Sequence, residues 1–162
     1  MRTGPLLLLV ALALSGPQPG AQAEGRDSSA LKGLGHSLCI LVEEPDADAK
    51  KAGVTAEKLK AALEEDLKKA GFGIDGVSPC LNLVLRTHAL AGAGLVSHYV
   101  ELALVEEVSP TRNGALRIQA RTWTQGAVGL SLSARLEPAV MATAAGSLAV
   151  FVDDYQLVHD GK

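Results

Sequence analysis

One helix with a sharply defined apolar stripe, over residues 55–70, constrains the fold of this chain most. Apolar residues recur along it at intervals of three and four positions: Ala56, Leu59, Leu63, Leu67 and Ala70. Thr55 is suited to cap the N-terminus, and Gly71 can close the C-terminus in a left-handed conformation. A helix that is apolar on one side must bury that side against another layer of structure.

Segments with the character of β-strands flank this helix and can provide that layer. Residues 37–44 form a short apolar run before it, and three alternating segments follow it: 80–88, 97–108 and 116–124. A second helix is expected to begin at Pro138 and to end near His159. The order β-α-β-β-β-α predicts an α+β fold, a two-layer sandwich with one four-stranded mixed sheet and both helices on one face. Residues 126–135 are rich in Gly and Ser, and we expect a loop or a ragged edge there.

The first 23 residues have the pattern of a secretory signal peptide. A basic start precedes an apolar run over residues 6–14, and Ala21-Gln22-Ala23 has the small-x-small form of a cleavage site. The apolar run is shorter than the roughly 20 residues that span a bilayer. We therefore expect a periplasmic or secreted protein with no stable membrane insertion after signal removal. A flexible lead-in over 24–36 and a single α+β domain over 37–160 would remain.

The chain has two cysteines, Cys39 and Cys80. In an oxidising compartment, pairing is the default expectation, although two buried free thiols remain an alternative. If the strands before and after the first helix are adjacent, they run parallel, and both cysteines lie at the same end of the sheet. A disulfide closing a loop of this length would stabilise the fold by roughly 4 kcal/mol.

No set of residues in the sequence forms a recognisable catalytic or ligand-binding site. A net charge of −3 argues against nucleic acid as a partner. Residues 92–94 lack the Lys-Ser/Thr of a phosphate loop, and residues 129–133 lack the last glycine of a nucleophile elbow. The acidic loop over 43–48 lacks the glycine and terminal Glu of a calcium loop. We expect no cofactor, no metal and no catalytic residue.

The apolar pattern favours one register for the first hairpin. Leu83 beside Leu104 and Leu85 beside Leu102 keep the leucines on one face. A register shifted by one residue would instead set His88 opposite His98, where the two could share a metal. In the favoured register His88 faces outward and His98 faces inward, so this metal pair is not formed.

For the second hairpin, Leu104 beside Ile118 continues the apolar side. A two-residue turn at Asn113-Gly114 is the alternative, but it would carry Pro110 through the strand ladder, which strands resist. The favoured pairing predicts a charged row and an aromatic row on the outer face: Arg86, Glu101 and Arg121, and His88, Tyr99 and Trp123. These rows either hold an exposed sheet face together or form a docking surface.

Two stretches resemble a family of small exported bacterial proteins of unknown function. They are residues 122–129, Thr-Trp-Thr-Gln-Gly-Ala-Val-Gly, and the helix ending Phe-Val-Asp-Asp-Tyr at 151–155; the helix over 54–72 is also similar. The resemblance covers roughly residues 37–158 and implies the same fold, an exported setting and no catalytic residues. The chain departs from the family in residues 155–159 and in its two cysteines. Its layout is also similar to the N-terminal domain of the periplasmic TolB protein, by fold alone.

These observations favour a non-catalytic exported module for binding or envelope assembly, which uses an open sheet face. Its partner would be an unknown protein of the cell envelope or a second copy of itself. The alternatives are a structural homodimer through the same face and, with less support, a small hydrolase or metal-dependent enzyme.

Overall fold

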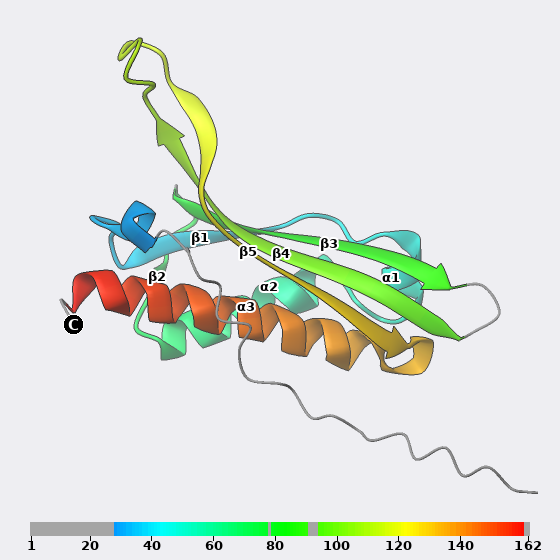
Figure 1. The fold of residues 1–162 in the computed structure, drawn as a ribbon. Coiled ribbons are helices and arrows are strands. Elements are labelled where there is room, and N and C mark those ends of the chain that lie inside the picture. Colours follow the sequence, from blue (N-terminus) through cyan, green and yellow to red (C-terminus); the bar gives the residue numbers. More distant parts are fainter. Residues whose placement is uncertain (1–27, 78, 91–93, 161–162) are drawn as a thin grey trace, which may run out of the picture.

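A computed structural model describes residues 28–77, 79–90 and 94–160 of the chain (Figure 1). Its strands are β1 (Ser37–Val42), β2 (Gly73–Ile74), β3 (Cys80–Leu90), β4 (Leu95–Val108) and β5 (Ile118–Leu132). Its helices are η1 (Ser28–Leu31), α1 (Ala47–Lys51), α2 (Ala56–Lys69), η2 (Ser133–Arg135) and α3 (Leu136–His159).

The strands form one open mixed sheet in the order β2-β1-β3-β4-β5. β1 runs parallel to β2 and β3, whereas β3, β4 and β5 are antiparallel to their neighbours. The long helices α2 and α3 lie along the same face of this sheet (Figure 1). The α+β class and the mixed sheet are confirmed. The expected strand number is wrong, because the two-residue strand β2 adds a fifth strand at one edge, and α1 is an additional short helix.

Helix α2 forms where its apolar stripe predicts it. The side chain of Thr55 accepts a hydrogen bond of 3.2 Å from the backbone N–H of Lys58, which caps the helix. Leu59, Leu63 and Leu67 are almost completely buried, and α2 packs against α3 and β1.

Helix α3 supplies the other half of the core. Its buried residues follow helical spacing: Leu136, Val140, Ala144, Ser147, Leu148, Phe151 and Tyr155. Together with η2 it spans Ser133–His159, which by length and composition alone is long and apolar enough to cross a membrane. In this structure the same helix packs against α2, β4 and β5.

The segment expected as a flexible lead-in contributes to the core from Leu31 onward. Leu31 and Leu34 are buried, and the hydroxyl of Tyr155 donates a hydrogen bond of 3.2 Å to the carbonyl oxygen of Leu34. The predicted signal peptide lies outside the described residues.

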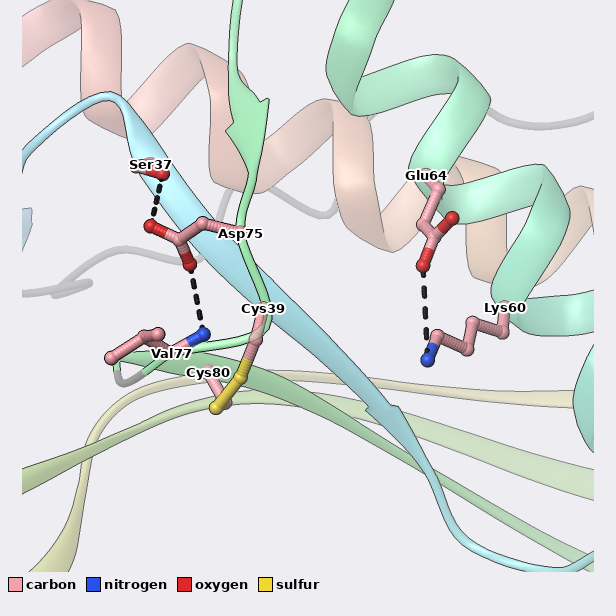
Figure 2. The surroundings of a disulfide bond; sticks show 7 residues. All are labelled: Ser37, Cys39, Lys60, Glu64, Asp75, Val77 and Cys80. Carbon is pink, nitrogen blue, oxygen red and sulfur yellow. Dashed lines mark hydrogen bonds and ion pairs between the residues drawn. A yellow bond between two sulfur atoms is a disulfide. The ribbon is translucent and has the colours of Figure 1, made fainter.

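Cys39 and Cys80 form a disulfide, as expected (Figure 2). They are direct register partners on the parallel strands β1 and β3, with their Cα atoms 4.4 Å apart. Their neighbours Leu38 and Ile40 point into the core, so the disulfide lies on the opposite side of the sheet. Below, the face of the sheet directed away from α2 and α3 is called the outer face.

The first hairpin has the predicted faces but a different register. Leu83 pairs with Leu102 rather than with Leu104, which is a shift of two residues. A shift of two returns every side chain to the same face, so the apolar pattern does not distinguish the two registers. As a result, Arg86 lies opposite Tyr99. The predicted partnership of Arg86 with Glu101 is wrong.

The same shift of two residues changes the cross-strand partner of His88. It lies opposite Ser97, so its predicted position opposite Tyr99 is also wrong. His88 is exposed and His98 is buried, as the sequence predicted.

The second hairpin departs further from its predicted register than the first. Leu104 pairs with Trp123 rather than with Ile118, and a β-bulge follows, after which Val105 pairs with Arg121. This is an odd shift, so Trp123 moves to the helix side of the sheet. Pro110 lies in the connection after Val108, and its carbonyl oxygen accepts a hydrogen bond of 3.0 Å from the N–H of Asn113.

Strand β5 also runs further than predicted. The ladder continues to the pair Leu95–Leu132, so residues 126–132 are strand and not loop. At the other end, β3 stops pairing at Cys80 with Val105, and beyond that point β4 and β5 pair only with each other. This part of the hairpin projects from the body of the sheet (Figure 1).

Candidate interaction surface

The outer face of the sheet is the surface that neither long helix covers (Figure 1). Helix α3 packs on β4 and β5, and α2 packs on β1, both from the other face. Four of the six residues predicted for this surface form close polar contacts on the outer face: Arg86, Tyr99, Glu101 and Arg121.

The central feature of this face is a cluster of three side chains. The hydroxyl of Tyr99 donates a hydrogen bond of 2.8 Å to Oε2 of Glu101, and Arg121 forms an ion pair with the other carboxylate oxygen. The hydrogen bond to the carboxylate raises the pKa of Tyr99 above its ordinary value. The predicted contact between Glu101 and Arg121 is thus present, although Glu101 has Gly126 as its direct register partner.

The ring of Tyr99 is accommodated by a glycine on the next strand. A β-carbon at Gly126 would lie 2.6 Å from the Tyr99 hydroxyl oxygen and 3.0 Å from the ring, closer than such atoms approach. Gly126 therefore provides the space that the Tyr99 ring occupies. Aromatic side chains commonly cover glycines in this way in twisted sheets.

Arg86 belongs to a separate ion pair. Its Nη2 lies 2.8 Å from Oε2 of Glu43, just beyond β1, and this hydrogen bond lowers the pKa of Glu43. The predicted charged row is therefore two pairs, Arg86–Glu43 and Arg121–Glu101. Exposed pairs of this kind stabilise a fold by at most about 1 kcal/mol.

His88 forms no part of an aromatic row. Its backbone carbonyl oxygen accepts a hydrogen bond of 3.3 Å from the Ser97 hydroxyl. It lines a shallow depression of about 180 Å³, together with Arg86, Tyr99 and Val128 among others. The aromatic content of the outer face is thus Tyr99 with the imidazole of His88 nearby.

Trp123 is not on this surface, and its prediction as a surface residue is wrong. It is only 3% exposed and belongs to the core. Its indole Nε1 donates a hydrogen bond of 2.9 Å to Oδ2 of Asp154 on α3, and its ring meets Phe151 edge-on with centroids 5.2 Å apart. The bulge between Leu104 and Val105 shifts the register and turns Trp123 inward.

Sequence reasoning missed a row of apolar side chains on the outer face. Val128, Leu130 and Leu132 are 78%, 60% and 55% exposed, respectively, and alternate along the end of β5. We call these three residues the apolar row. The alternation was visible in the sequence, but the glycines at 126 and 129 made the segment resemble a loop.

His98 lies on the helix side, away from His88. It is 4% exposed, its Nε2 lies 3.4 Å from the hydroxyl of Thr143, and its Nδ1 has no hydrogen-bond partner. Desolvation lowers the pKa of His98. Within residues 28–77, 79–90 and 94–160, no three His, Cys, Asp or Glu side chains gather in a group that could hold a metal ion.

Comparison with known proteins gives a likeness in structure but none in sequence. No protein-family model matches the chain, and no curated protein matches it in sequence. Among solved structures, the fold is similar to that of a minor lipoprotein from Acinetobacter baumannii, with a TM-score of 0.36 and 12% sequence identity. The match covers 78% of this chain and 92% of that one. A likeness at this level does not carry function over to this chain.

Proposed function

We propose that this chain is an exported, non-catalytic module that binds a protein of the cell envelope through the outer face of its sheet. The observation that carries the proposal is the juxtaposition, on a face without a helical cover, of the ordered cluster around Tyr99 and the exposed apolar row. Tyr99 and Val128 are direct register partners, so the two features form one surface.

The chemistry of this surface suits a protein partner. Tyr and Arg are enriched among the residues that dominate binding energies, and an apolar patch beside them excludes water. The Glu101 carboxylate holds both Tyr99 and Arg121, which reduces the side-chain entropy lost on binding. Arg121 remains half exposed and can reach a partner while it keeps this contact.

The same contacts favour binding over catalysis. The carboxylates of Glu43 and Glu101 are each engaged by an arginine, so neither is poised as a general base. The disulfide between Cys39 and Cys80 supports export, because disulfides persist in oxidising compartments.

Site-specific photo-crosslinking in the native envelope tests this proposal. A benzophenone amino acid replaces Arg86 on the outer face and, in a matched control, Gln156 on the exposed side of α3. We expect a defined adduct from position 86 and none of the same mass from position 156. Equal adducts from both positions, or an adduct of twice the mass of this chain at 86, would overturn the proposal; the second result would indicate a homodimer through the face.

Binding of the captured protein is then measured with purified variants. Tyr99→Ala removes the central aromatic side chain and should weaken the complex by about 2 kcal/mol or more, which is roughly 30-fold. Gln156→Ala should leave the affinity unchanged. Thermal melts show whether the Tyr99 variant remains folded; a folded Tyr99→Ala protein with unchanged affinity would contradict the role of this face.

A further inference from the structure

Strand β5 leaves a long edge of the sheet unpaired. It has 15 residues and pairs only with β4 among the described strands. The opposite edge is blunted, because β2 has only two residues. There, the carboxylate of Asp75 accepts hydrogen bonds from the Ser37 hydroxyl and from the backbone N–H of Val77 (Figure 2).

Helix η1 contacts β5, but the second half of the strand lacks the charges and prolines that usually prevent edge-to-edge pairing. Residues 122–132 contain no charged side chain and no proline. The arginines that precede this stretch, Arg117 and Arg121, lie outside it. Natural edge strands are commonly protected by Lys, Pro, a bulge or a short length. The bulge of this hairpin lies at Leu104/Val105, at the start of the uncharged stretch, and leaves the remainder regular.

We propose that β5 pairs antiparallel with β5 of a second copy of this chain, about a two-fold axis at Val128. In this register Val128 lies opposite its own equivalent, and Leu130 lies opposite Gly126 of the other copy. On both sides of the axis, the large side chain of Leu130 therefore lies opposite a glycine, which has no side chain. On the helix-side face the arrangement pairs Ala127 with Gly129, which places two small residues together.

The same features favour a second copy over an unrelated strand. A two-fold axis makes the interface isologous, so one strand must be complementary to itself. Here no like charges meet across residues 122–132, and the large and small residues interdigitate. The apolar rows of the two copies would meet at the axis through Val128, which is 78% exposed in the single chain. The backbone N–H and C=O groups of both edges would gain partners.

This inference goes beyond the proposed function and does not depend on it. Edge pairing extends the sheet sideways and leaves the cluster of Tyr99, Glu101 and Arg121 on an open face. Failure of the pairing therefore shows in the oligomeric state of the purified protein, without any partner protein. Failure of the proposed function shows in the crosslinking and affinity measurements.

Sedimentation velocity of the purified protein over a wide concentration range tests the pairing. We expect a reversible monomer–dimer equilibrium. Val128→Lys sets two like charges opposite each other at the axis and should raise the dimer dissociation constant at least tenfold. Leu41→Lys is the matched control, because Leu41 is 53% exposed on β1 near the other edge, and its substitution should leave the equilibrium unchanged.

A cysteine placed on the axis allows a second measurement, covalent crosslinking, which detects a dimer even when association is weak. Val128→Cys should form an intermolecular crosslink with a short bismaleimide, since directly opposite Cβ atoms lie about 4.5–5.5 Å apart, whereas Leu41→Cys should not. A wild-type chain that stays monomeric throughout, with no crosslinked Val128→Cys dimer, would overturn the proposal. So would a dimer that Val128→Lys and Leu41→Lys leave equally intact.

Discussion

The hydroxyl oxygen of Tyr99 lies 2.6 Å from the point that a β-carbon would occupy at Gly126 on the neighbouring strand. On the other face of the same two strands, the ring of His98 lies against Gly129, its direct register partner. Each glycine of β5 thus makes room for a ring of β4: the ring of Tyr99 is half-buried and that of His98 is enclosed.

The two glycines should respond differently to substitution by alanine. Tyr99 can move its ring outward, so Gly126→Ala should cost less than about 1 kcal/mol of unfolding free energy. His98 is enclosed between β5 and Thr143 on α3, so Gly129→Ala should cost about 1–3 kcal/mol, as overpacking does. Urea melts of both variants measure the difference.

A double-mutant cycle assigns the cost of Gly129→Ala to the ring of His98. His98→Ala combined with Gly129→Ala should destabilise the protein by less than the sum of the two single changes. Additive effects would show that the alanine at 129 is not opposed by His98.

Acid should destabilise the fold through His98 before it affects the carboxylates. Burial lowers the pKa of His98, so the folded state binds its proton less tightly than the unfolded state, whose value is near 6.5. The contribution of neutral His98 to stability is complete above the unfolded-state pKa. It is lost as the pH falls below that pKa toward the lower pKa of the folded state. Glu43, Asp46 and Asp75 have lowered pKa values, so their contributions are lost only at more acidic pH, below their unfolded values near 4.

Unfolding free energies measured from pH 8 to pH 5 in wild type and His98→Gln check this expectation. The wild type should lose stability below about pH 6.5, and the variant should show a smaller slope there. An identical pH profile for the two proteins would contradict the assignment to His98.

Reduction of the disulfide should lower stability without changing the fold. Cys39 and Cys80 are 41 positions apart, and loop closure of that length is worth roughly 4 kcal/mol before strain is considered. Thiol titration of the unreduced protein in denaturant should detect almost no free thiol. Two reactive thiols would contradict the pairing, and Cys39→Ser with Cys80→Ser should reproduce the stability of the reduced protein.

The sequence predicted the layers of this fold because its helices and strands carry clear apolar periodicities. The stripe of α2 and the leucines of β3 and β4 specify which side is buried. The parallel placement of β1 beside β3 followed from the crossover through α2, and with it the disulfide. The strand β2 was not predicted, because two residues carry no periodicity.

The candidate surface could be predicted only in part, for reasons of register. The pattern of alternate leucines is unchanged by a shift of two, so Arg86 could not be assigned its partner from it. The bulge near Trp123 adds one residue to one strand and leaves no signal in an apolar pattern. The requirement that Pro110 lie outside the ladder was correct, but it led to a predicted turn too close to β4. In the structure Pro110 lies in a longer connection between Val108 and Ile118.

The environment of Trp123 reports directly on the register of β5, because the register that buries Trp123 also exposes the apolar row. As the chain's single tryptophan, it is a direct fluorescent probe of this register. We predict blue-shifted emission shielded from soluble quenchers, and a loss of about 3–5 kcal/mol on Trp123→Ala, with Leu130→Ala as a control that costs less than about 1 kcal/mol. Red-shifted, readily quenched emission with a stable Trp123→Ala protein would place the indole on the outer face and contradict the register.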